Sequence, residues 1–268
     1  MLFTKGRKKE KSRMEIFLTP YFLYLLMSVD VPVIFAICIV LALLAYGLRA
    51  LDWIGSLTAL IIGLIVGVFG GLSWLVVLVI FLFISFAATK YKYNFKSSIG
   101  ETDGKKGERR WNNVIANGTI PALIAVLSSF ALPKQLAGVL FITAISAAMS
   151  DTLASEIGII SDRVYLITNM KKVERGTNGG VSFLGTNAAF FGALFIPIVG
   201  WIILSEFSFL PGRRLILIPI LIGFLGCQID SVLGATLEGK ILTKDTVNLV
   251  SISVSVLIAW VILWITYC

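Results

Sequence analysis

Ser146-Ala-Ala-Met-Ser-Asp-Thr-Leu-Ala-Ser-Glu-Ile-Gly158 is an apolar segment that nevertheless holds two carboxylates, Asp151 and Glu156. An ionised carboxylate in the hydrocarbon of a bilayer costs several kcal/mol, so both side chains are expected to face protein, water or a cation instead of lipid. On a straight α-helix, positions five apart lie about 140° apart around the axis. Either the helix breaks in this segment, or Asp151 and Glu156 serve different partners.

The composition of the chain places the rest of it in a membrane as well. Of its 268 residues, 57% are hydrophobic and only 14% are charged, whereas soluble proteins average roughly half apolar and a quarter charged. The basic residues before Met14 lead into a long apolar run without the small-residue pattern of a signal-peptide cleavage site. We therefore expect residues 1–13 to form a basic cytoplasmic tail.

Hydropathy and the positions of Gly and Pro predict an all-α fold, a polytopic transmembrane helix bundle of about nine spans. The expected spans are 14–29, 31–48, 54–69, 72–88, 113–131, 136–160, 178–203, 215–236 and 246–266. The first is short enough to lie in the membrane interface, which would leave eight. Residues 14–268 are expected to form a single transmembrane catalytic domain with a cytoplasmic loop at 90–112.

The distribution of positive charge favours nine spans with the N-terminus in the cytoplasm. In that topology all of the 23 lysines and arginines except Lys134, Arg213 and Arg214 face the cytoplasm, as the positive-inside rule requires, and eight spans would divide them more evenly. Asp151 and Glu156 then lie below a basic cytoplasmic rim. That rim is formed by Lys105, Lys106, Arg109 and Arg110.

The chain has no histidine, and its three cysteines are far apart in sequence. Histidine-based acid-base catalysis is therefore excluded, and no disulfide framework is indicated. Asp151, Glu156 and Asp230 offer the oxygen ligands that Mg²⁺ uses together with substrate phosphates. Because phosphoryl transfer needs mainly positioning and charge neutralisation, these residues predict magnesium-assisted phosphate chemistry.

Two other functions fit the same carboxylates. Intramembrane Asp and Glu are typical of cation-coupled transporters, which expose such residues alternately to the two faces of the membrane. A CTP-dependent lipid cytidylyltransferase would use a similar site to transfer CMP to a lipid phosphate. The segment Thr177-Asn-Gly-Gly-Val-Ser-Phe-Leu-Gly185 is also open to two interpretations, as a helix start that binds phosphate or as a simple cap, and we favour the first.

The string Ala147-Ala-Met-Ser-Asp-Thr-Leu-Ala-Ser-Glu-Ile-Gly158 resembles the Ala-Asp-Thr-x-Ala-Ser-Glu-x-Gly signature of a family of integral membrane proteins that includes plant phytyl-phosphate kinase. The likeness extends from about Leu51 to near the C-terminus. Four more blocks match in the same order: Val114-Ile-Ala-Asn-Gly118, Gly176-Thr-Asn-Gly-Gly-Val-Ser-Phe-Leu-Gly-Thr186, Gly223-Phe-Leu-Gly-Cys-Gln-Ile-Asp-Ser-Val-Leu-Gly-Ala235 and Asp245-Thr-Val-Asn248.

This resemblance implies a kinase that transfers a phosphoryl group from CTP to an isoprenoid monophosphate, such as phytyl or geranylgeranyl phosphate, with Mg²⁺ as cofactor. The substrates would meet at the cytoplasmic face of the bilayer, and no nucleic-acid partner is expected. The expected metal ligands and catalytic residues are Asp151, Glu156 and Asp230. The expected substrate and nucleotide contacts are Lys105, Lys106, Arg109, Arg110, Asn113, Asn117, Ser155, Thr177, Asn178 and Asn248.

Overall fold

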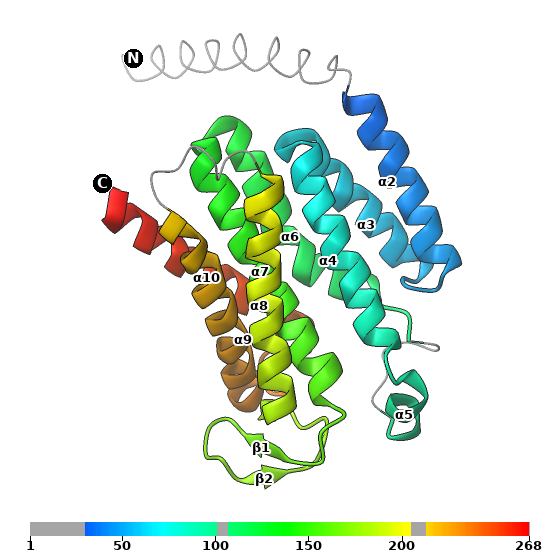
Figure 1. The fold of residues 1–268 in the computed structure, drawn as a ribbon. Coiled ribbons are helices and arrows are strands. Elements are labelled where there is room, and N and C mark those ends of the chain that lie inside the picture. The colour runs from blue at the N-terminus through cyan, green and yellow to red at the C-terminus, as the bar shows by residue number, and fades with distance from the viewer. Residues whose placement is uncertain (1–29, 101–106, 205–212, 268) are drawn as a thin grey trace, which may run out of the picture.

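The computed structural model describes residues 30–100, 107–204 and 213–267, which form a bundle of membrane-length helices (Figure 1). Within these ranges, 8 helices are long and apolar enough to cross a membrane. They correspond to the last eight of the spans expected from the sequence, so the polytopic helix bundle is confirmed. The expected tail at 1–13 and the expected span at 14–29 lie outside the described residues.

The helices run alternately up and down through the bundle. A short helix, α5, follows α4, and a π-helical turn, η1, continues α3. The bounds are α2 Asp30–Gly47, α3 Trp53–Ile65, η1 Val66–Gly70, α4 Leu72–Lys90, α5 Tyr93–Ser98, α6 Trp111–Phe130, α7 Lys134–Gly158, α8 Phe183–Ile203, the 3₁₀ turn η3 Arg213–Ile216, α9 Leu217–Leu237 and α10 Lys244–Tyr267.

Local sequence explains where several helices begin and end. Asp52 caps α3, because its carboxylate accepts a hydrogen bond of 2.6 Å from the Gly55 backbone N–H. Gly71 has a φ of +98°, a conformation open to glycine but strained for other residues, and it turns the chain from η1 into α4. The expected spans 54–69 and 72–88 are therefore joined as a helical hairpin at Gly70 and Gly71.

A small antiparallel sheet interrupts the helical pattern between α7 and α8. Its strands are β1 Val164–Leu166, β2 Lys172–Val173 and β3 Gly180–Val181, in the order β2-β1-β3. Val164 pairs with Val173, and Tyr165 pairs with Val181 on the other side. The sequence analysis predicted a helix from residue 178, whereas α8 begins at Phe183 because residues 180–181 belong to this sheet.

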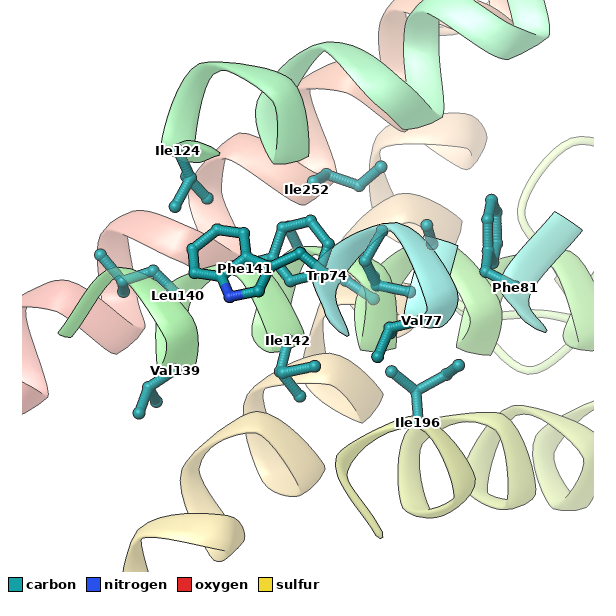
Figure 2. Packing of buried hydrophobic residues seen from close by; sticks show 14 of the residues in the cluster. Trp74, Val77, Phe81, Ile124, Val139, Leu140, Phe141, Ile142, Ile196 and Ile252 are labelled. Atoms are coloured by element: carbon teal, nitrogen blue, oxygen red, sulfur yellow. The ribbon is translucent and has the colours of Figure 1, made fainter. Parts of the chain in front are cut away.

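Helix α7 is the centre of the bundle. Within its membrane-length window 89% of the residues are buried, compared with 22–39% for the other candidate spans in the described part of the chain. The Trp74 and Phe141 rings stack with centroids 4.4 Å apart, and Val77, Ile142 and Ile196 pack around them (Figure 2). An apolar core thus surrounds the half of α7 that precedes Asp151.

The chain connections gather polar residues at one end of the bundle. Helix α5 and strands β1 and β2 all lie at the lower end of the bundle in Figure 1, with α5 to the right and the strands to the left. The turn from α9 to α10 reaches the same end, because Lys244 and the backbone of Gly180 line one cavity. We call this the polar end of the bundle.

Candidate functional site

Small residues let α8 and α9 approach α7 closely on either side of its polar segment. A Cβ atom at Gly192 of α8 would lie 3.0 Å from the Met149 carbonyl oxygen, so only glycine fits this contact without movement. The Ser150 hydroxyl donates a hydrogen bond of 2.9 Å to the Ala189 carbonyl, which ties α7 to α8. Close packing through small residues is a common way for helices to associate in membranes.

The polar segment of α7 is a continuous helix, which resolves the alternative left open by the sequence. The helix runs without interruption from Lys134 to Gly158. Asp151 and Glu156 therefore point in different directions, as their five-residue spacing requires on a straight helix. Each carboxylate has its own set of partners.

Asp151 faces α9, where it meets Asp230. The two carboxyl groups lie within hydrogen-bonding reach of each other. The Ser251 hydroxyl of α10 donates a hydrogen bond of 2.9 Å to Asp230 Oδ2. With its amide turned to suit its neighbours, Asn248 Nδ2 donates to the same oxygen at 3.2 Å. Two residues of α10 thus hold the Asp230 side chain of α9 beside Asp151 of α7.

Glu156 faces a different direction from Asp151 and lies in an ion-pair network. Lys96 Nζ of α5 approaches Glu156 Oε2 at 2.7 Å, and Arg109 Nη2 approaches Oε1 at 3.3 Å. The Thr89 hydroxyl donates to Oε1 at 2.6 Å. Both carboxylate oxygens of Glu156 are therefore engaged, and within the described residues no group of three His, Cys, Asp or Glu side chains is arranged to hold a metal. The structure does not place Glu156 with the two aspartates as a third magnesium ligand.

A polar cavity of about 370 Å³ opens at the polar end and contains both carboxylate clusters. It brings together seven of the residues that the sequence analysis selected. These are Asp151, Ser155, Glu156, Thr177, Asn178, Asp230 and Asn248.

A glycine-rich loop forms one wall of this cavity. Gly179 has a φ of +73° and lies against α9, where a Cβ atom would come within 2.6 Å of the Ser231 carbonyl oxygen. This close approach holds Thr177 and Asn178 at the cavity wall. The neighbouring start of α8 is already capped, because the Ser182 hydroxyl accepts from the Gly185 N–H at 3.1 Å. Ser182 therefore caps α8 at the Gly185 N–H, and both this cap and the preceding residues 176–181 line the cavity.

Charged residues beyond α9 surround the mouth of the cavity. Lys244, at the start of α10, interacts electrostatically with Asp151 and with Glu238. Burial raises the pKa of the Glu238 carboxyl above its usual range. Lys244 opposes this rise, and the negative charges of Asp151 and Asp245 add to it. The mouth of the cavity thus combines the Lys244 ammonium with the Glu238 carboxyl group, whose pKa is raised.

Several predicted residues lie elsewhere. Asn113 and Asn117 line a separate, mostly apolar cavity, and Arg110 is exposed outside both cavities. Arg109 binds Glu156 and Thr89, so its guanidinium positions these side chains instead of forming part of an open rim. The predicted contacts of Lys105 and Lys106 lie outside the described residues.

The sequence analysis missed three charged residues of the cavity, namely Lys96, Glu238 and Lys244. Lys96 is the least expected, because its side chain is only 2% exposed although it lies in a polar, lysine-rich loop. Its burial depends on the folding of α5 against Glu156, which no local pattern indicates. Glu238 and Lys244 flank the turn between two expected spans. This position at the end of the spans could have indicated that they lie near the other polar residues of the site.

The aspartate pair fits a hard divalent cation. Two carboxylates this close repel each other unless a proton or a cation neutralises them. Mg²⁺ commonly binds through one or two carboxylates and completes its shell with water and substrate phosphates. Asp151 and Asp230 have the chemistry for this arrangement, with Ser251 orienting one of them.

Fold and site together define a polytopic membrane protein with a polar cavity built around intramembrane aspartates. The family model described as integral membrane protein DUF92 matches residues 36–259, and the chain belongs to this family. No solved structure matches the chain.

Relatives of the chain occur in archaea, cyanobacteria and plants. The chain is 35% identical to uncharacterized membrane protein MJ0933 of Methanocaldococcus jannaschii over 81% of its own length and 87% of that protein. It is 34% identical to uncharacterized membrane protein sll0875 of Synechocystis, over 71% of the chain and 74% of that protein. It is 31% identical to the chloroplastic protein VTE6 of Arabidopsis thaliana, over 82% of the chain and 65% of that protein.

Proposed function

We propose that this integral membrane protein is a kinase that transfers a phosphoryl group from a nucleoside triphosphate to an isoprenoid monophosphate. CTP as donor and phytyl or geranylgeranyl phosphate as acceptor follow from the resemblance to the phytyl-phosphate kinase family. Residues 14–268 would act as one catalytic domain, with the polar end at the cytoplasmic face. The observation that carries the proposal is the Asp151–Asp230 pair at the base of a polar cavity.

The reaction needs no histidine. The acceptor is a phosphate monoester, and its oxygen is already anionic near neutral pH. That oxygen attacks the γ-phosphorus of the donor and forms a new P–O bond. The bond between the γ-phosphorus and the bridging oxygen breaks, and its electron pair leaves with the nucleoside diphosphate. The site has only to align the two phosphates and reduce their repulsion.

Asp151 and Asp230 would hold Mg²⁺, which supplies charge neutralisation for the phosphates when bound. Ser251 and Asn248 hold the Asp230 carboxylate in one orientation through hydrogen bonds of 2.9 and 3.2 Å. A fixed ligand geometry of this kind keeps the metal site organised before substrate arrives.

Phosphate groups would be bound by residues at the wall and the mouth of the cavity. Asn178 presents its amide group on the glycine-rich loop, and Lys244 brings positive charge to the same space. The Thr177 hydroxyl donates to the Glu174 carbonyl oxygen at 2.7 Å and so holds the loop. The Lys96 ammonium is occupied by Glu156 and by the Ala88 carbonyl at 2.9 Å. We therefore assign Lys96 and Glu156 to positioning of α5 beside the cavity.

The packing of the core gives less support to a transporter. The half of α7 that precedes Asp151 carries Phe141, Ile142 and Ile145, which pack in one apolar cluster with Trp74 of α4. All four residues are 0% exposed, and Figure 2 shows Trp74, Phe141 and Ile142. In the described part of the chain this apolar layer separates the cavity from the other end of the bundle. Alternating access would require it to rearrange.

Product analysis with labelled CTP separates the candidate functions. Purified protein in lipid nanodiscs would receive geranylgeranyl phosphate, Mg²⁺ and CTP labelled at either the α- or the γ-phosphate. The kinase proposal predicts γ-label in the lipid diphosphate and release of CDP. Transfer of α-label to the lipid with release of pyrophosphate would identify a cytidylyltransferase. Absence of both products, together with a cation flux in liposomes, would overturn the proposal in favour of transport.

A further inference from the structure

We propose that the chain has a second ligand site, an apolar cavity that binds a single-chain lipid with a hydroxyl head group, such as a long-chain alcohol. The cavity lies between α2, α3, α4 and α6. It shares no lining residue with the polar cavity, so the inference does not depend on the proposed kinase activity.

The walls of this cavity suit a hydrocarbon chain. Aliphatic side chains from α2, α3 and α4 form most of its lining, and its volume is about 80 Å³. Leu41, Leu60 and Leu78 are only half-buried, so the cavity reaches the surface of the bundle beside α2. In the membrane-length window of α2 only 22% of the residues are buried, the lowest share among the described spans. A chain could therefore enter from the bilayer.

One end of the cavity is polar and has an unmet hydrogen bond. Asn117 is 4% exposed, and its Nδ2 donates to the Asn113 carbonyl oxygen at 2.8 Å. Its Oδ1 is buried and has no hydrogen-bond partner in the part of the chain that the structure describes. A buried acceptor left unpaired is unfavourable, so a ligand that donates a hydrogen bond here is favoured.

Arg109 completes this polar end. Its Nε donates to the Thr89 hydroxyl at 3.2 Å, and its Nη2 pairs with Glu156 at 3.3 Å. A guanidinium has five N–H donors, so further donors remain to hydrogen-bond a ligand oxygen. A ligand hydroxyl group can donate to Asn117 Oδ1, and Arg109 lines the same cavity.

Other ligands satisfy only part of the site. A plain hydrocarbon leaves Asn117 Oδ1 unpaired, and a fully ionised carboxylate or phosphate has no proton to donate to it. Water would find hydrogen-bond partners only at the polar end, because the remaining walls are aliphatic. The volume of about 80 Å³ is smaller than the cavity of roughly 150 Å³ that binds benzene in an engineered protein. It therefore accommodates only part of one hydrocarbon chain.

Photolabelling in nanodiscs tests the site directly. The probe is a long-chain alcohol with a diazirine at mid-chain, and the matched control is the alkane of the same length with the same diazirine. We expect the alcohol to label cavity residues on α2, α3 and α4, around Cys38, Leu60 and Leu78, and excess 1-dodecanol to compete. One hydrogen bond of about 1 kcal/mol corresponds to roughly fivefold stronger labelling by the alcohol than by the alkane.

Two variants separate the head-group contact from the chain contact. Asn117→Leu should abolish the fivefold preference for the alcohol, and Thr119→Val, on an exposed turn of the same helix, should leave it unchanged. Ala42→Phe fills the cavity from α2 and should remove labelling by both probes. Equal labelling by alcohol and alkane in the wild-type protein, or labelling confined to lipid-exposed surfaces, would overturn the proposal whether or not the protein is a kinase.

Discussion

Replacing Glu156 by Gln tests the assignment of this residue to the ion-pair network. The substitution keeps the shape of the side chain and removes the charge that pairs with Lys96 and Arg109. The Lys96 side chain is 2% exposed and that of Glu156 is 16% exposed, so the ammonium would remain buried without its counter-charge. Loss of one partner from a buried ion pair typically costs 3–5 kcal/mol, and we expect about 3 kcal/mol here because Lys96 keeps its hydrogen bond to Ala88.

A double-mutant cycle measures how much of this loss comes from the pair itself. Lys96→Met alone leaves Glu156 with Arg109 and Thr89 as partners. Combining Lys96→Met with Glu156→Gln removes both charges, so the loss should be smaller than the sum of the single losses by about 2 kcal/mol. The assay is equilibrium unfolding of the purified protein by denaturant in mixed micelles.

Binding of Mn²⁺, followed by electron paramagnetic resonance, distinguishes this role from metal ligation. Glu156→Gln should leave Mn²⁺ affinity unchanged, whereas Asp230→Asn should weaken it by about tenfold or more. The reasoning is refuted if Glu156→Gln weakens Mn²⁺ binding as much as Asp230→Asn does, or if it has no effect on stability.

Three further changes test the packing and the cavity. Gly192→Val should lower the free energy of unfolding by about 1–3 kcal/mol because the added carbon meets Met149. Gly47→Ala, with open space around the glycine, should have little effect. Equal effects of the two substitutions in denaturant unfolding would contradict the close packing of α8 against α7. Ser251→Ala should weaken Mn²⁺ binding about tenfold through loss of a ligand-orienting hydrogen bond, and unchanged affinity by paramagnetic resonance would count against this role. Glu238 has a raised pKa in the folded state, so its contribution to stability falls as pH rises above the pKa of about 4.5 that it has in the unfolded chain. Glu238→Gln should therefore stabilise the protein relative to wild type more at pH 7 than at pH 4. A stability difference that is independent of pH would be inconsistent with burial as the cause of the raised pKa.

The helix bundle could be predicted from the sequence because lipid leaves few alternatives for an apolar chain. Spans were located within a few residues, and breaks such as Gly70-Gly71 depend on local backbone preferences. The small sheet between α7 and α8 was not predicted, since its strands are two or three residues long. Short strands of this kind form through pairing with distant residues, which local periodicity does not reveal.

The candidate site could be predicted in part. Asp151, Asp230 and Asn248 stood out because polar residues within apolar spans need a reason to be there, and the structure brings them together. Helical geometry left two alternatives for Asp151 and Glu156, a broken helix or separate partners, and the continuous helix α7 decides for separate partners. Lys96 could not be predicted, because its burial is a tertiary effect created when α5 packs beside α7.

The most direct test of the central claim is the initial rate of prenyl diphosphate formation from geranylgeranyl phosphate, Mg²⁺ and CTP in nanodiscs. The wild type would be compared with Asp230→Asn and with Ser253→Ala, a control that removes a hydroxyl bonded within its own helix. The account predicts formation of diphosphate by the wild type, a loss on the order of a hundredfold or more in Asp230→Asn, and a normal rate in Ser253→Ala. Diphosphate formation that persists at the wild-type rate in Asp230→Asn would contradict it.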